Sequence, residues 1–125
     1  MTLRRIAEIL DAEFLVTAGN PDTEIRSVCS SDLMSDLLHF AGKPKSLLIT
    51  GLINNQVVRT AEIADIKAVV FVLNKKPDRE TVSFAAEKGI WLLATRFSRF
   101  TACGRLYEVG LRSCTEENGH DKTAP

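Results

Sequence analysis

The 125-residue sequence predicts an α/β fold, namely a single three-layer domain with a largely parallel β-sheet and βαβ crossovers. Three apolar segments indicate this fold: SLLIT (46–50), KAVVFVL (67–73) and IWLLAT (90–95). They contain few polar residues, as is typical of parallel strands that are covered on both faces. Helical patterns separate them, and strand–helix–strand units of this kind form right-handed crossovers.

The amino-terminal region predicts a helix and two short strands. Thr2 suits the N-cap of the helix. Its inner face is formed by apolar residues at helical spacing: Leu3, Ile6, Ala7 and Leu10. EFLVTAG (13–19) predicts a strand, followed by a turn at GNPD (19–22). EIRSVCS (24–30) predicts a half-exposed strand or extended segment in which Ile25 and Val28 are the apolar positions.

A second helix is expected in SSDLMSDLLHFAG (30–42). Ser30, Ser31 or Asp32 can cap it, and Gly42 followed by Pro44 ends it. The residues expected on its inner face are Leu33, Met34, Leu37, Leu38 and Ala41.

Three further helices are expected after the three apolar strands. The first has an inner face of Val57, Val58, Ala61 and Ala64. The second has Val82, Ala85 and Ala86, with Pro77 in its first turn. The third begins near Ser98, ends near Gly110, and is expected to turn inward Phe100, Cys103, Leu106 and Tyr107.

The pattern indicates one domain over residues 1–112. After Leu111 no apolar periodicity remains, so residues 113–125 are expected to form a disordered carboxyl-terminal tail that can be deleted without loss of folding.

Composition excludes several classes of protein. The net charge is zero, with 16 basic and 16 acidic side chains, which argues against a general nucleic-acid binder. No apolar run has the length of a membrane span, and the amino terminus lacks the features of a secretory signal. We therefore expect a cytoplasmic protein that binds neither nucleic acid nor membrane.

The cysteines and histidines indicate neither a metal site nor a disulfide framework. Cys29, Cys103 and Cys114 are far apart and odd in number, without a CxxC pair, and the two histidines have no nearby ligand partners. Cys29 and Cys103 are expected to be small buried core residues. No metal and no cofactor are predicted.

A ligand site is expected at the carboxyl ends of the parallel strands, where open sheets of this kind bind ligands. Four segments should meet there: 29–32, 50–55, 74–78 and 95–100. Helix starts at this edge favour an anion, and Lys75, Lys76 and Arg96 add positive charge. The candidate ligand-binding residues are Thr50, Gly51, Asn54, Asn55, Arg59, Ser31, Asp32, Thr95 and Ser98.

The alternative interpretation of the same residues is structural. Thr50, Asn54, Ser98 and Ser31 are residue types that cap helices in any case, and Gly51 can serve only the turn.

No catalytic residue is predicted. GKPK (42–45) is not a P-loop, because Pro44 replaces the Ser or Thr and no glycine stands five residues earlier. Asp32 and Asp36 suit the start of a helix, and no Ser–His–Asp set can be assembled.

The sequence resembles the DRTGG-domain family over residues 24–111. The resemblance rests on SDLMSDLL (31–38), TGLINNQVVRTAE (50–62) and GIWLLATRFSRFTACGRLYEVGL (89–111). The domain is similar to the amino-terminal domain of HPr kinase/phosphorylase and, more distantly, to that of Mur ligases. In regulatory pyrophosphatases it lies between nucleotide-binding CBS domains, which implies a regulatory or dimerising role. This chain departs from the family pattern at residues 52–54 and at VLNKK (72–76), where many members carry Thr-Gly-Gly.

Three functions compete. The first is a non-catalytic regulatory module that binds a nucleotide or other phosphorylated small molecule. The second is a protein–protein interaction or dimerisation module without a small ligand. The third is a small enzyme that uses Cys29 with Asp32. We also expect a homodimer, because closed two-fold dimers are the commonest assembly, with Phe100, Tyr107 and Leu111 of the last helix as the contact.

Overall fold

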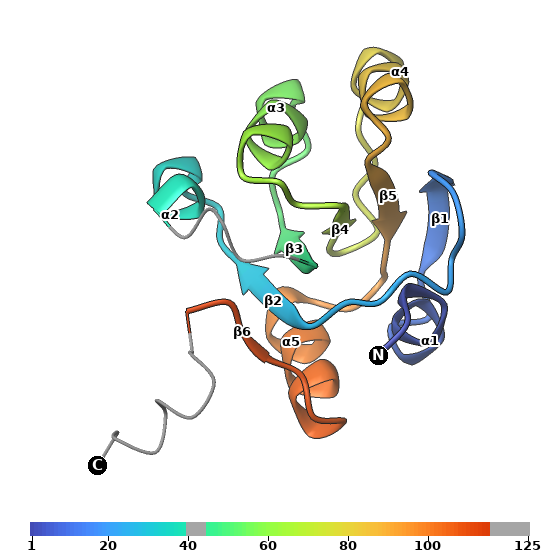
Figure 1. Cartoon of the computed structure of the whole chain (residues 1–125), viewed down its shortest axis with the longest axis vertical. Coiled ribbons are helices and arrows are strands. Elements are labelled where there is room, and N and C mark those ends of the chain that lie inside the picture. Colours follow the sequence, from blue (N-terminus) through green and yellow to red (C-terminus); the bar gives the residue numbers. More distant parts are fainter. Residues whose placement is uncertain (40–44, 116–125) are drawn as a thin grey trace.

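The computed structural model describes residues 1–39 and 45–115, which form one sheet with helices on both faces (Figure 1). Its helices are α1 (Leu3–Ile9), α2 (Met34–His39), α3 (Asn55–Ile63), α4 (Arg79–Lys88) and α5 (Arg99–Glu108). Its strands are β1 (Glu13–Val16), β2 (Ser27–Ser30), β3 (Ser46–Thr50), β4 (Ala68–Phe71), β5 (Trp91–Ala94) and β6 (Arg112–Ser113).

The strand order is β1-β5-β4-β3-β2-β6, and every neighbouring pair is parallel except β1 with β5. The three apolar segments of the sequence therefore form adjacent parallel strands. Leu48 pairs with Val69, which pairs with Leu92. The predicted α/β fold with a largely parallel sheet is confirmed.

The sheet separates two apolar layers, which explains the uninterrupted apolar strands. Helices α2, α3 and α4 cover one face, and α1 and α5 cover the other (Figure 1). Successive strand residues point to opposite faces. Leu47 and Val70 therefore join the core beneath α1 and α5, whereas Leu48 and Val69 join the core beneath α2, α3 and α4.

Side-chain caps begin four of the helices. Thr2, Asn54, Asp78 and Ser98 each accept a hydrogen bond from a backbone N–H three residues later. Thr2 was expected in this role. Pro77 was expected in the first turn of α4, but Asp78 is the cap, so Pro77 precedes the helix.

Helix α3 buries the predicted face, whereas α2 does so only in part. Val57, Val58, Ala61 and Ala64 are all buried. In α2, Leu37 is buried, but the prediction was wrong for Leu33 and Leu38, which are 58% and 43% exposed. Leu33 precedes the six-residue helix, and so short a helix covers little of the sheet. The expected positions Ala41, Gly42 and Pro44 lie outside the described residues.

Helices α4 and α5 also differ from the predicted inner faces. Ala85 is buried in α4, but Ala86 is exposed. In α5 the buried residues are Ala102 and Leu106, whereas Phe100 is 89% and Tyr107 58% exposed. The prediction failed because α5 rests on the sheet through one narrow stripe, and both aromatic residues lie on another face. Leu111, expected at a dimer contact, is buried in the core.

The ordered domain continues past the expected boundary at residue 112. Arg112 and Ser113 form β6, whose residues pair with Ser27 and Val28 of β2. The Cys114 N–H then donates to the Val28 carbonyl over 2.8 Å, and the Cys114 side chain is 2% exposed. Residues 116–125 lie outside the described part of the chain, so the prediction of a disordered tail concerns them alone.

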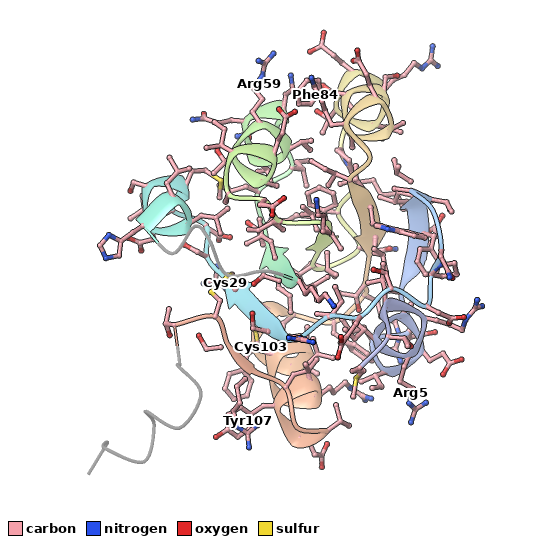
Figure 2. All side chains as sticks on the ribbon, in the orientation of Figure 1. Arg5, Cys29, Arg59, Phe84, Cys103 and Tyr107 are labelled. Carbon is pink, nitrogen blue, oxygen red and sulfur yellow. A yellow bond between two sulfur atoms is a disulfide. The ribbon has the colours of Figure 1, made fainter. Side chains whose placement is uncertain are left out.

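A disulfide joins Cys29 of β2 to Cys114, with 5.2 Å between their Cα atoms (Figure 2). The expectation of no disulfide was wrong, because the two cysteines are 85 residues apart in sequence and only the pairing of β6 with β2 brings them together. Cys29 is buried as predicted, while Cys103 is a free thiol of intermediate exposure. No helix in the described residues is long and apolar enough to cross a membrane.

Candidate functional site at the carboxyl edge of the sheet

The four segments expected at the carboxyl edge of the sheet do meet there. The Asn74 N–H donates to the Thr95 carbonyl over 2.7 Å, which joins the loop after β4 to the loop after β5. The Lys75 Nζ donates to the Gly51 carbonyl over 3.3 Å. The Gly51 N–H in turn donates to the Asp32 carboxylate over 2.8 Å. Loops that follow β2, β3, β4 and β5 are thus connected by hydrogen bonds.

The carboxylate of Asp32 is the centre of this edge. Its Oδ1 accepts hydrogen bonds from the Thr50 hydroxyl (2.8 Å) and the Gly51 N–H (2.8 Å). The same oxygen pairs with Nη1 of Arg99, the first residue of α5, at 2.9 Å. One carboxylate therefore ties the loop after β2 to the end of β3 and to the start of α5.

The surroundings of Asp32 lower the pKa of its carboxyl group. Partial burial raises the pKa, but the hydrogen bonds from Gly51 and Thr50 and the charge of Arg99 together lower it by more. The carboxyl group is therefore held as an anion at neutral pH. It occupies the position at Gly51 where an external anion was expected.

Backbone N–H groups at the start of α3 donate hydrogen bonds to the protein's own side chains. The buried Thr50 hydroxyl donates to Asp32 and accepts from the Leu52 N–H over 3.2 Å. The Asn54 Oδ1 accepts from the Val57 N–H over 3.3 Å, as an N-cap. The Asn55 Oδ1 is buried and has no hydrogen-bond partner among the described residues.

The side chains of two predicted residues, Arg59 and Thr95, are engaged away from this edge. The Arg59 guanidinium lies 5.1 Å from the centroid of the Phe84 ring, between α3 and α4 (Figure 2). The Thr95 side chain is fully buried, and its hydroxyl donates to the Leu10 carbonyl over 2.6 Å. Thr95 thus secures the end of α1, and Arg59 packs on an aromatic ring of the outer helical layer.

The remaining predicted residues shape the edge without forming a cradle by themselves. The Ser31 hydroxyl bonds to the backbone of Leu33, and Ser98 caps α5. Two of the cations expected nearby are paired elsewhere: Lys76 with Glu13 and Arg96 with Asp11, each at 3.1 Å. Lys75 and Arg99 are the cations that bond to the turn and to Asp32.

Arg99 was not predicted, although the sequence holds a signal for it. A helix start carries partial positive charge, which disfavours a cation in the first turn. Arg99 follows the Ser98 cap directly, so a partner carboxylate could have been expected. Which carboxylate it is depends on the tertiary structure.

An open groove of about 910 Å³ runs along α5 beside the end of β2. It is lined by Ser30, Ser98, Arg99, Phe100, Cys103, Gly104, Tyr107 and Glu108. The sequence did not predict this groove, although it placed Phe100 and Tyr107 both on the inner face of the last helix and at a dimer contact. The groove is next to Asp32, because Arg99, which lines the groove, pairs with the Asp32 carboxylate.

In this structure Cys29 cannot act as the nucleophile that the enzyme hypothesis requires. Cys29 is 4% exposed and bonded to Cys114, whereas a reactive cysteine needs an accessible thiolate. Within residues 1–39 and 45–115, no three His, Cys, Asp or Glu side chains gather as a metal site.

No family model matches the chain, and no curated protein matches it. A solved structure does match: the CBS and DRTGG domains of the regulatory region of Clostridium perfringens pyrophosphatase, complexed with its activator diadenosine tetraphosphate. The TM-score is 0.64 at 15% sequence identity. The similarity covers 84% of this chain and 45% of the solved chain, so this chain spans less than half the length of its structural neighbour. The neighbour is a regulatory region rather than a catalytic domain. The DRTGG-like fold expected from the sequence is confirmed.

Proposed function

We propose that the protein is a non-catalytic regulatory module of the cytoplasm that binds a nucleotide or other phosphorylated small molecule. The site is the carboxyl edge of the sheet around the turn between β3 and α3. Thr50, Gly51, Asn54 and Asn55 lie around the ligand. Arg99 and Lys75 replace Arg59 as its charge partners.

The observation that carries this proposal is the position of the Asp32 carboxylate. It is an anion bound by a backbone N–H, a hydroxyl and a guanidinium, which are the groups that bind phosphate in proteins. The Asp32 side chain is 46% exposed, so it has room to turn into solvent when a ligand takes over its partners. A phosphate group then takes its place on Gly51 and Arg99.

Two further features support a phosphorylated ligand. The Lys75 ammonium is held beside the same turn by the Gly51 carbonyl, so a second positive charge is at hand. The structurally similar pyrophosphatase region was solved with a dinucleotide activator. That likeness supports the class of ligand, and the binding residues are argued from this chain alone.

Thermal melts test the proposal with AMP, ADP, ATP, cyclic dinucleotides, phosphate and sulfate. A ligand at about one hundred times its dissociation constant stabilises the fold by about 2.7 kcal/mol. In a domain of this size that raises the melting temperature by about 10 °C. We expect a nucleotide to produce this shift, and we expect Arg99→Gln to abolish most of it.

Two pairs of variants make the test specific. Arg105→Gln changes another exposed arginine of the same helix, whose guanidinium lies 4.2 Å from the centroid of the Phe97 ring, and should keep the shift. Asn54→Ala should lose both its cap and the ligand shift, whereas Asp78→Ala loses the cap of α4 alone and should keep the ligand shift. If no nucleotide or oxyanion moves the parent's melt at millimolar concentration, this edge is structural.

The second candidate is an interaction or dimerisation module that needs no small ligand. The exposed aromatic residues of α5 favour it, because Phe100 alone leaves 89% of its surface in water. This candidate would be supported if the protein associates without any ligand and if no ligand changes its melting temperature.

A further inference from the structure

The last described strand of the sheet is fastened by a disulfide. β6 has two residues and lies at the edge of the sheet beside β2 (Figure 1). Among the described residues after Leu111, which is buried in the core, Cys114 has the one buried side chain. Segments with few buried contacts open readily, so the Cys29–Cys114 bond is the main link that keeps this segment on β2.

The same disulfide lies close to the candidate site. Cys29 stands three residues before Asp32, in the loop that follows β2. A cavity of about 90 Å³ separates this loop from the segment after β6. It is lined by Ser31 and by Leu37 of α2 as well as by Cys114 and Thr115. The segment that the disulfide fastens therefore packs beside the loop that carries Asp32.

We propose that the Cys29–Cys114 pair is a redox switch that controls the ligand affinity of the candidate site. The inference rests on the proposed function, in which Asp32 leaves Gly51 and Arg99 when a phosphate group binds there. With the disulfide formed, residues 113–115 are fixed beside the Asp32 loop, and Asp32 stays on Gly51. With the disulfide reduced, these residues detach and the loop moves more freely. A phosphorylated ligand then displaces Asp32 at lower cost, so the reduced protein has the higher affinity.

Reduction requires a dithiol reductant and proceeds by thiol–disulfide exchange. A thiolate of the reductant attacks Sγ of Cys114, the protein's S–S bond breaks, and Cys29 leaves as a thiolate. The second thiol of the reductant then displaces Cys114 from the mixed disulfide. The protein gains two electrons and two protons, and the reductant becomes a disulfide. Cys29 and Cys114 are 4% and 2% exposed, so the attack takes place when the edge segment opens locally.

Both redox states suit the rest of the fold. Leu106 and Leu111 belong to the core beneath α1 and α5, so reduction releases only the chain from residue 112 onward. The Cα atoms of the two cysteines are 5.2 Å apart, within the usual range for a disulfide, so the bond can form again when the segment returns. The proposed function belongs to the cytoplasm, where disulfides are usually transient and often sense the redox state.

The first test needs no ligand. Cys103→Ser removes the free thiol, so thiol titration of the denatured protein should find none after oxidation and two after dithiothreitol. NMR then measures the pKa of the Asp32 carboxyl group in both forms. It should be lowered in the oxidised protein and closer to its ordinary value in the reduced one. Asp65, which pairs with Lys67 beyond α3, should titrate alike in both. Equal pKa values of Asp32 in the two forms, or thiols that do not oxidise, would overturn the proposal.

The second test is calorimetric titration of the Cys103→Ser protein with ATP. The dissociation constant should be about tenfold lower for the reduced than for the oxidised form. Cys114→Ala in the same background should bind like the reduced form with and without dithiothreitol. Because coupling is reciprocal, saturating ATP should raise the reduction potential of the disulfide by about 30 mV, the equivalent of a tenfold change for two electrons.

The outcomes separate the switch from the site. If ATP binds both redox forms with equal affinity, the switch is overturned and the proposed function stands. If ATP, the other nucleotides and inorganic phosphate bind neither form, the proposed function is overturned and control of ligand affinity is overturned with it.

Discussion

Asp32 shows how one exposed side chain can join several elements. Its carboxylate accepts from Thr50, Gly51 and Arg99, and these bonds hold its pKa below the ordinary value although burial opposes them. A carboxyl group whose pKa is lower in the folded than in the unfolded state stabilises the fold above the unfolded pKa. That contribution disappears as the pH falls through the folded pKa.

We therefore expect Asp32→Asn to destabilise the protein in a pH-dependent manner. At pH 7 the free energy of unfolding should fall by about 1 kcal/mol, a figure reduced for the exposure of the pair. The difference between parent and variant should shrink as the pH falls below about 4. Urea unfolding at several pH values measures it, and Asp36→Asn, an exposed carboxylate of α2, is the control. If Asp32→Asn lowers the free energy of unfolding equally at pH 7 and pH 2.5, the pKa of Asp32 is not lowered by folding.

At the scale of elements, the parallel strands are stable because both faces are covered. Val70 of β4 is fully buried and lies between β3 and β5. Its neighbour Val69 is equally buried in the opposite layer, so no position in this strand faces water.

Val70→Asp should therefore unfold or severely destabilise the domain. It buries a carboxylate without a partner, at a cost of roughly 4 kcal/mol or more, which is a large part of the stability of a small domain. Ile63→Asp, at a site that is 71% exposed on α3, should change the urea midpoint little. A soluble Val70→Asp variant that melts like the parent would show that β4 is not covered on both faces.

At the scale of the whole molecule, the last described residues close the fold. β6 extends the sheet beyond β2, and Cys114 attaches this edge to Cys29 across 85 residues of sequence. A covalent link over so long a loop restricts the unfolded chain and typically contributes about 2–4 kcal/mol.

Truncation after Arg112 should therefore lower the melting temperature by about 10 °C, contrary to the expectation from sequence. Truncation after Thr115 keeps β6 and the disulfide and should leave the melting temperature unchanged. The melts are run with and without reductant, so that the contribution of the disulfide is separated from that of the β6 pairing. If the truncations melt alike in both conditions, β6 and its disulfide do not contribute to stability.

The sequence by itself determined the class of the fold and the edge of the sheet at which the candidate site residues meet. An apolar run such as Ala68–Phe71 has no polar position to face water, which favours a strand that is covered on both faces, as in a parallel sheet. The order strand, helix, strand then brings the carboxyl ends together. Local signals also placed the caps Thr2, Asn54 and Ser98, because capping depends on residues that are close in sequence.

The tertiary structure alone decided which side chains meet. Asp32 and Arg99 are 67 positions apart, and Cys29 and Cys114 are 85, so no local pattern could pair them. The exposure of Phe100 and Tyr107 was also decided by the tertiary structure, since the sequence placed both residues on the inner face of a helix as well as at a dimer contact. Whether an apolar residue is buried depends on how a helix is rotated against its sheet, and α5 is rotated so that Ala102 and Leu106 face the core and the two aromatic rings face water.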